Sequence, residues 1–99
     1  MGRQEQIINE IKKKVVHILK KNKVVRAGIF GSYARGDQNK DSDVDILIDV
    51  RSKGFSLLDM AKIKIELEEI LKKEVDLLTY NGINPHFEKY ILNDEVKII

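Results

Sequence analysis

The chain has 99 residues, of which 42% are apolar and 34% are charged, so it is neither disordered nor too large for a single domain spanning residues 1–99. Eighteen basic and 16 acidic residues leave a net charge of +2, and this near balance argues against direct nucleic-acid binding. The lack of cysteine excludes disulfides and thiolate metal sites, and no apolar run is long enough for a membrane span. We therefore expect a cytoplasmic protein with no membrane partner.

The first half of the chain predicts a helix, a strand and a short helical turn. Residues 4–22 repeat apolar side chains at helical spacing, with lysines on the opposite face. Residues 24–30 are β-branched and apolar, which is typical of a strand. Gly31 and Ser32 end that strand, and a helical turn can begin at Ser32. Residues 36–42 are polar and predict a loop.

The second half predicts two further strands and two further helices. Residues 44–50 alternate between an apolar face and a face with two aspartates, which favours a half-buried strand. A helix follows from the Ser56 cap to about residue 73, and residues 74–79 form a third strand. Asn84 and Pro85 start a helix to about residue 93, and residues 96–99 allow a terminal strand. This order predicts an α/β (α+β) fold: a small mixed sheet with helices packed on one face.

A Gly-Ser turn between the first strand and the short helix is the first candidate site. Gly31 lacks a side chain, so a ligand can approach the backbone closely. Ser32 offers a hydroxyl and a backbone N–H at a helix start, where the first N–H groups have no internal partners. This turn therefore predicts phosphate binding.

Three aspartates form the second candidate site. Asp43 and Asp45 are two residues apart at the start of a strand, so both carboxylates project from one face. Asp76 interrupts an apolar strand and can join them if the two strands are neighbours. Adjacent carboxylates resist joint ionisation, and Mg²⁺ prefers such oxygen ligands together with substrate phosphates. Three carboxylates around two Mg²⁺ ions would support in-line attack on phosphorus.

The string GSYARGDQNKDSDVDILI, with Gly31-Ser32 ten residues before Asp43-x-Asp45, resembles the polymerase-beta-like nucleotidyltransferase superfamily and, within it, the minimal nucleotidyltransferase (MNT) family. The resemblance implies a nucleotidyltransferase fold and an Mg²⁺-dependent transferase that uses ATP. It implies that Asp43, Asp45 and Asp76 are catalytic metal ligands, and that Gly31 and Ser32 bind the nucleotide phosphates. Arg35 either contacts phosphate or braces the loop.

Structural interpretations exist for several of these residues. Asp43 could cap a turn, and Asp76 could be an edge-strand charge. The lysines of the first helix favour a solvated face over a nucleic-acid patch. Tyr33 could stack on a base or lie on the surface.

The small size leaves little room for an acceptor pocket, so a partner chain is expected to supply the acceptor. Many MNT proteins resemble antitoxins that transfer AMP to a tyrosine of a helical HEPN toxin, and this resemblance implies the same function here, in a homo- or hetero-oligomer. The alternatives are a small-molecule nucleotidyltransferase and a non-catalytic toxin-binding module. Six apolar residues exceed what the short helices can bury and predict an interface: Phe55, Leu57, Leu58, Ile83, Phe87 and Tyr90.

Overall fold

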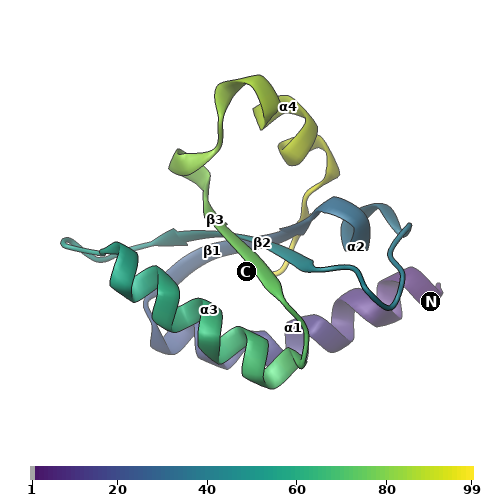
Figure 1. Cartoon of the computed structure of the whole chain (residues 1–99), viewed down its shortest axis with the longest axis horizontal. Helices are drawn as coiled ribbons and strands as arrows, with labels where there is room; N and C mark the ends of the chain where they lie inside the picture. The colour runs from purple at the N-terminus through teal and green to yellow at the C-terminus, as the bar shows by residue number, and fades with distance from the viewer. Residues whose placement is uncertain (1) are drawn as a thin grey trace.

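A four-stranded mixed sheet forms the centre of the protein, whose computed structural model describes residues 2–99. The strand order is β3-β2-β1-β4. β1 (Val24–Phe30) is antiparallel to β2 (Val44–Val50) and to β4 (Val96–Lys97), whereas β3 (Val75–Thr79) runs parallel to β2. Figure 1 shows the elements in place. The predicted α+β class and mixed sheet are confirmed.

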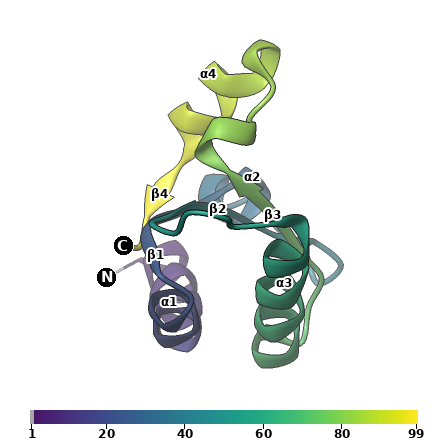
Figure 2. The same cartoon turned by 90° about the vertical axis from the view of Figure 1, so that its left-hand side faces the viewer.

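Helices α1 (Arg3–Lys21) and α3 (Leu57–Leu71) cover one face of this sheet (Figure 2). Their apolar stripes are buried as the helical spacing predicts, and they pack against alternate residues of β2. A fully buried aliphatic side chain contributes about 1.5–3 kcal/mol to stability, so this layer holds the fold together. Its largest fully buried side chains are Val15, Leu19, Ile29, Val44, Ile46, Ile48, Ile63 and Leu67.

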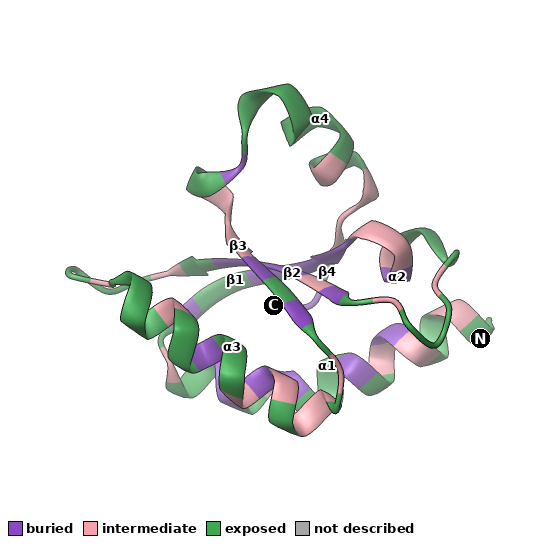
Figure 3. Cartoon of the chain, in the orientation of Figure 1, coloured by how far each residue is buried: buried purple, intermediate pink, exposed green. Residues whose placement is uncertain are grey.

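The last helix lies on the opposite face of the sheet, whereas the sequence predicts the helices on one face. The 3₁₀ turn η1 (Tyr80–Gly82) leads into α4 (Pro85–Asp94), and α4 stands over the sheet in Figures 1 and 2. A small second core joins Phe30, Leu47 and Ile83 beneath it. None of the ten residues of α4 is buried, as the colours of Figure 3 show. α4 therefore keeps most of its surface free.

Local signals set most element boundaries. Ser56 and Asp59 form a reciprocal capping box that starts α3. That helix ends at Leu71, two residues before the predicted end, because Lys72 adopts a left-handed backbone with φ of 55°. Asn84 caps α4 and Pro85 is its first residue, as predicted. β4 is shorter than predicted, although the N–H groups of residues 98 and 99 donate to the Ala27 carbonyl at 2.9 and 3.2 Å.

Within residues 2–99, no helix has both the length and the apolar character that crossing a membrane requires.

Candidate active site

The Gly-Ser turn lies where β1 passes into the short helix α2 (Gly31–Arg35). Gly31 has a φ of +72°, a backbone conformation that residues with a side chain rarely adopt. A Cβ at this position would lie 2.0 Å from Oδ2 of Asp45. Glycine is therefore required both for the turn and for the close approach of the Asp45 carboxylate to the backbone.

The register of the sheet brings two of the three predicted acids together. Asp45 lies opposite Phe30 on β1 and opposite Asp76 on β3. Asp43 immediately precedes β2, two residues from Asp45, and its charge acts on Asp45. Asp45 is partly buried, whereas Asp43 and Asp76 are exposed. All three lie at the end of the sheet that also carries Gly31.

Burial and like charge shift the acid at the centre of this group. Burial, followed by the charges of Asp76 and then Asp43, raises the pKa of Asp45 from 3.8 to about 6, and the charge of Arg35 partly opposes this shift. Across residues 2–99, however, no group of three acidic or histidine side chains is gathered tightly enough to hold a metal ion as it stands. The roles of the three aspartates as metal ligands remain predictions.

The raised pKa predicts how stability depends on pH without metal. Ionisation of Asp45 is unfavourable in the folded protein. The stability that protonated Asp45 contributes is therefore fully present below about pH 4 and is lost as the pH rises through about 6. Asp45→Asn should therefore be more stable than the wild type near pH 7 by about 1–2 kcal/mol, a value reduced for the solvent exposure of the carboxyl. Urea unfolding in EDTA at several pH values measures this difference, and an equal difference at pH 4 would contradict the prediction.

Arg35 braces the loop that follows α2, which is one of its two predicted roles. Its guanidinium contacts Asp37 at 3.1 Å and Asp94, near the end of α4, at 3.2 Å. These hydrogen bonds raise the pKa of Arg35, and they tie α2 and the following loop to α4. Arg35 is close enough to Asp45 to influence its charge. A contact with phosphate remains a prediction.

Tyr33 does not lie on the surface, which was one of its two predicted placements. Its side chain is only 6% exposed and packs in the main core, and contact with a base stays a prediction. The five-residue helix α2 lies against α1, and the Gln4 side-chain amide donates a hydrogen bond to the Tyr33 carbonyl. The packing of α2 against its neighbours leaves the Tyr33 side chain in the core.

The family of the chain follows from comparison with known proteins. Residues 13–99 match the family described as "Polymerase beta, Nucleotidyltransferase", and this match includes the Gly-Ser turn and all three acids. The chain belongs to this nucleotidyltransferase family. The resemblance noted from the sequence is thereby confirmed.

Two similar proteins have narrower names. The nucleotidyltransferase is 54% identical over 92 residues to "Putative protein adenylyltransferase MJ0435" of Methanocaldococcus jannaschii, covering 93% of this chain and 98% of that protein. A solved structure of a "putative minimal nucleotidyltransferase" is 31% identical, has a TM-score of 0.77, and overlaps 92% of each chain.

A toxin–antitoxin complex contains the same fold. A chain of the "tri-AMPylated Shewanella oneidensis HEPN toxin in complex with MNT antitoxin" matches with a TM-score of 0.72 and 17% identity. The match covers 92% of this chain and 71% of that chain. At this identity the likeness shows the fold alone.

A second polar cluster of this nucleotidyltransferase was not predicted. The Tyr80 hydroxyl donates a hydrogen bond to Glu95, and the Arg26 guanidinium lies 4.0 Å from the Tyr80 ring centroid. Gly28 leaves room for this carboxylate, because a Cβ there would lie 2.1 Å from Glu95 Oε2. The cluster ties η1 to the start of β4 and so fixes both ends of the segment that carries α4. Its members are far apart in sequence, so no local spacing signals them.

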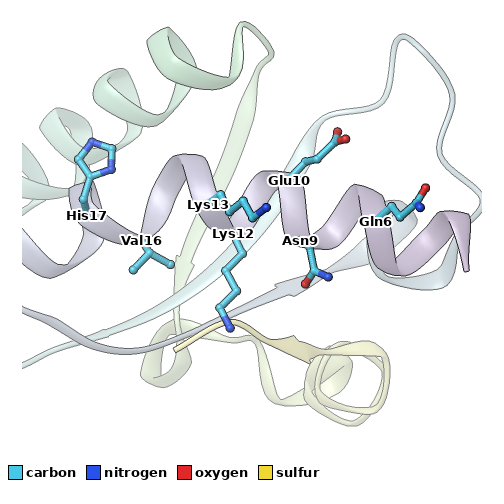
Figure 4. Close-up of a pocket in the computed structure, with 7 residues that line it drawn as sticks. All are labelled: Gln6, Asn9, Glu10, Lys12, Lys13, Val16 and His17. Atoms are coloured by element: carbon cyan, nitrogen blue, oxygen red, sulfur yellow. The ribbon is translucent and has the colours of Figure 1, made fainter. Parts of the chain in front are cut away.

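A hollow of about 670 Å³ on the outer side of α1 is separate from this site. Figure 4 shows its lining, which comes from the helix alone and includes Lys12, Lys13 and His17. None of the three aspartates contributes to it. We assign it to the solvated helix face that the sequence predicts.

Proposed function

We propose that this nucleotidyltransferase acts as an antitoxin that transfers AMP from ATP to a tyrosine hydroxyl of a HEPN toxin in the cytoplasm. The observation that carries the proposal is the Asp45 carboxylate, which lies against Gly31 and opposite Asp76 in the sheet. The adenylyltransferase name of a 54% identical relative supports AMP as the transferred group. The HEPN–MNT complex of the same fold supports the partner. Residues 1–99 act here as one catalytic domain.

The donor atoms at this site fit Mg²⁺. The three carboxylates supply oxygen ligands only, and burial, followed by the charges of Asp76 and Asp43, raises the pKa of Asp45. Asp43 and Asp76 are exposed, so their side chains have room to rotate toward Asp45. In this proposal Asp43, Asp45 and Asp76 would together hold two Mg²⁺ ions. When bound, Mg²⁺ neutralises phosphate charge and lowers the pKa of the acceptor hydroxyl.

The residues of the chain position the nucleotide and accept a proton. Ser32 offers its hydroxyl and backbone N–H to the phosphates, and Gly31 allows them to approach the turn closely. The tyrosine oxygen bonds to the α-phosphorus, the bond from that phosphorus to the α,β-bridging oxygen breaks, and pyrophosphate leaves. The tyrosine proton passes to the Asp76 carboxylate. Arg35 holds the loop between Gly36 and Asp43 against α4 through Asp37 and Asp94.

Exposed apolar side chains support a protein acceptor. Four of the six residues expected at an interface are exposed: Leu57 at 87%, Leu58 at 82%, Tyr90 at 72% and Phe87 at 57%. The other two pack inside, because Ile83 joins the second core and Phe55 packs against the main core. The exposed residues fall at the start of α3 and on α4. Such surfaces commonly mark protein interfaces, so the functional unit in this proposal is a hetero-oligomer.

Co-expression with the product of the neighbouring gene tests the partner directly. The expected result is an added AMP mass on a tyrosine of that protein, seen by mass spectrometry of the intact chain and its peptides. The addition should disappear when Asp43→Ala is co-expressed instead. If the two proteins neither associate nor react, and a small molecule is adenylylated instead, the antitoxin proposal fails.

A further inference from the structure

A groove on the α1 side of α2 lies apart from the three aspartates. It consists of two adjoining hollows, of about 280 and 530 Å³, which share Ile7 and Gln38 in their linings. The groove runs between the first half of α1 and the segment from α2 to the start of β2, elements that lie close together in Figure 1. None of the three aspartates lines either hollow.

The smaller hollow combines apolar surface, three charged side chains (Glu10, Lys14 and Lys73) and one unpaired polar atom. Ile11, Tyr33 and Leu71 supply apolar and aromatic surface. Oε1 of Gln38 is buried and has no hydrogen-bond partner among the described residues. A buried oxygen without a partner is costly, because it loses its hydrogen bonds to water. Gln38 as a whole is only partly buried, so a turn of its side chain would bring Oε1 into the hollow, where the amino group of a flat ring would donate the missing hydrogen bond.

The larger hollow is polar and basic. Arg3 and Arg35 line it together with Gln4 and Gly36. Arginine presents several N–H donors in a planar fork that matches phosphate oxygens. The two hollows meet at Gln38, so a ring in the smaller one and a phosphate in the larger one can belong to the same molecule.

We propose that this groove binds a nucleoside monophosphate at a second site, distinct from the site at Asp43 and Asp45. The base lies against Ile11, Tyr33 and Leu71, and its amino group donates to Gln38 Oε1. The phosphate contacts Arg3 and Arg35. The proposal does not depend on the transfer of AMP to a toxin, because binding here requires neither metal nor acceptor.

Calorimetric titration of the whole chain with AMP in EDTA tests the site. The wild type should bind AMP, and the Asp43→Asn, Asp45→Asn double variant should bind it without loss of affinity. Arg3→Glu should weaken binding by about tenfold or more, because it removes a charged phosphate contact and adds a repulsive charge. Lys13→Glu makes the same charge change on the outer side of α1 (Figure 4), outside the groove, and should change affinity by no more than about twofold.

The base contact has its own test. Purine riboside monophosphate lacks the amino group of AMP, so the wild type should bind it about fivefold more weakly than AMP, the scale of one hydrogen bond. Gln38→Leu should bind the two nucleotides equally. The proposal is overturned if the wild type binds no AMP at millimolar concentration, if the double aspartate variant loses binding, or if Arg3→Glu and Lys13→Glu behave alike. Circular dichroism of each variant verifies that it is folded.

Discussion

Replacing Asp43 and Asp45 together with asparagine is expected to abolish nucleotidyl transfer and to leave the protein folded. In the proposed mechanism these two carboxylates hold the metal on which the transfer depends. Their loss should lower the rate by about a thousandfold or more. The fold does not depend on them, because both lie outside the apolar core. Relief of the unfavourable ionisation of Asp45 should even raise thermal stability near neutral pH.

Asp49→Asn is the matched control for this double variant. Asp49 lies on β2, the same strand as Asp45, and alternation places both on the same face of the sheet. It is exposed and lies opposite Arg26 rather than Gly31. The transfer rate of Asp49→Asn should remain within about twofold of the wild type, because charges separated along an exposed strand are screened. Retained transfer by the Asp43→Asn, Asp45→Asn variant would rule out the proposed catalytic role of these acids.

Gly31→Ala is expected to reduce transfer because the added methyl group displaces the Asp45 carboxylate, although no catalytic side chain is removed. The new Cβ would overlap Asp45 Oδ2, at 2.0 Å, and would also crowd its Cγ at 2.9 Å. The Asp45 carboxylate would have to rotate away from the turn, so transfer should fall by about a hundredfold or more, the scale of a misplaced catalytic group. The positive φ of residue 31 should also cost about 1–2 kcal/mol of stability with any side chain present. Steady-state kinetics and thermal unfolding measure the two effects separately.

Gly54→Ala is the control that separates the stability cost of a positive φ from the effect of the contact with Asp45. Gly54 has a similar φ of +81°, but a Cβ there would meet nothing within 4 Å. Both alanine variants should therefore lose similar stability, and only Gly31→Ala should lose transfer. Equal activity in the two variants would mean that the approach of Asp45 to Gly31 does not matter for the reaction.

Local sequence patterns predict the elements that position the site. β1 and β2 have the predicted bounds, because β-branched residues and strict alternation distinguish a half-buried strand. The strand that carries Asp76 is also predicted, although its neighbour is left open, and the parallel pairing of β3 with β2 brings Asp76 opposite Asp45. These predictions succeed because each depends on side chains that are close in sequence.

Contacts between distant segments limit what the sequence can predict. The burial of Tyr33 depends on the packing of α2 against α1, and no spacing within the motif encodes it. The bracing of Arg35 depends on Asp94, which is 59 residues away. The position of α4 on the opposite face follows from Ile83 and the small second core, since the helix itself has no buried stripe. Tertiary geometry, rather than local propensity, decides each of these features.

Transfer from ATP labelled at a single phosphate tests the central claim most directly. The chain is incubated with Mg²⁺, the neighbouring gene product and ATP that carries a radiolabel at either the α- or the γ-phosphate. Our account predicts that the α-label alone becomes attached to the partner, that pyrophosphate is released in equal amount, and that EDTA prevents both. Transfer of the γ-label, or α-label transfer that persists in the Asp43→Asn, Asp45→Asn variant, would contradict nucleotidyl transfer at this site.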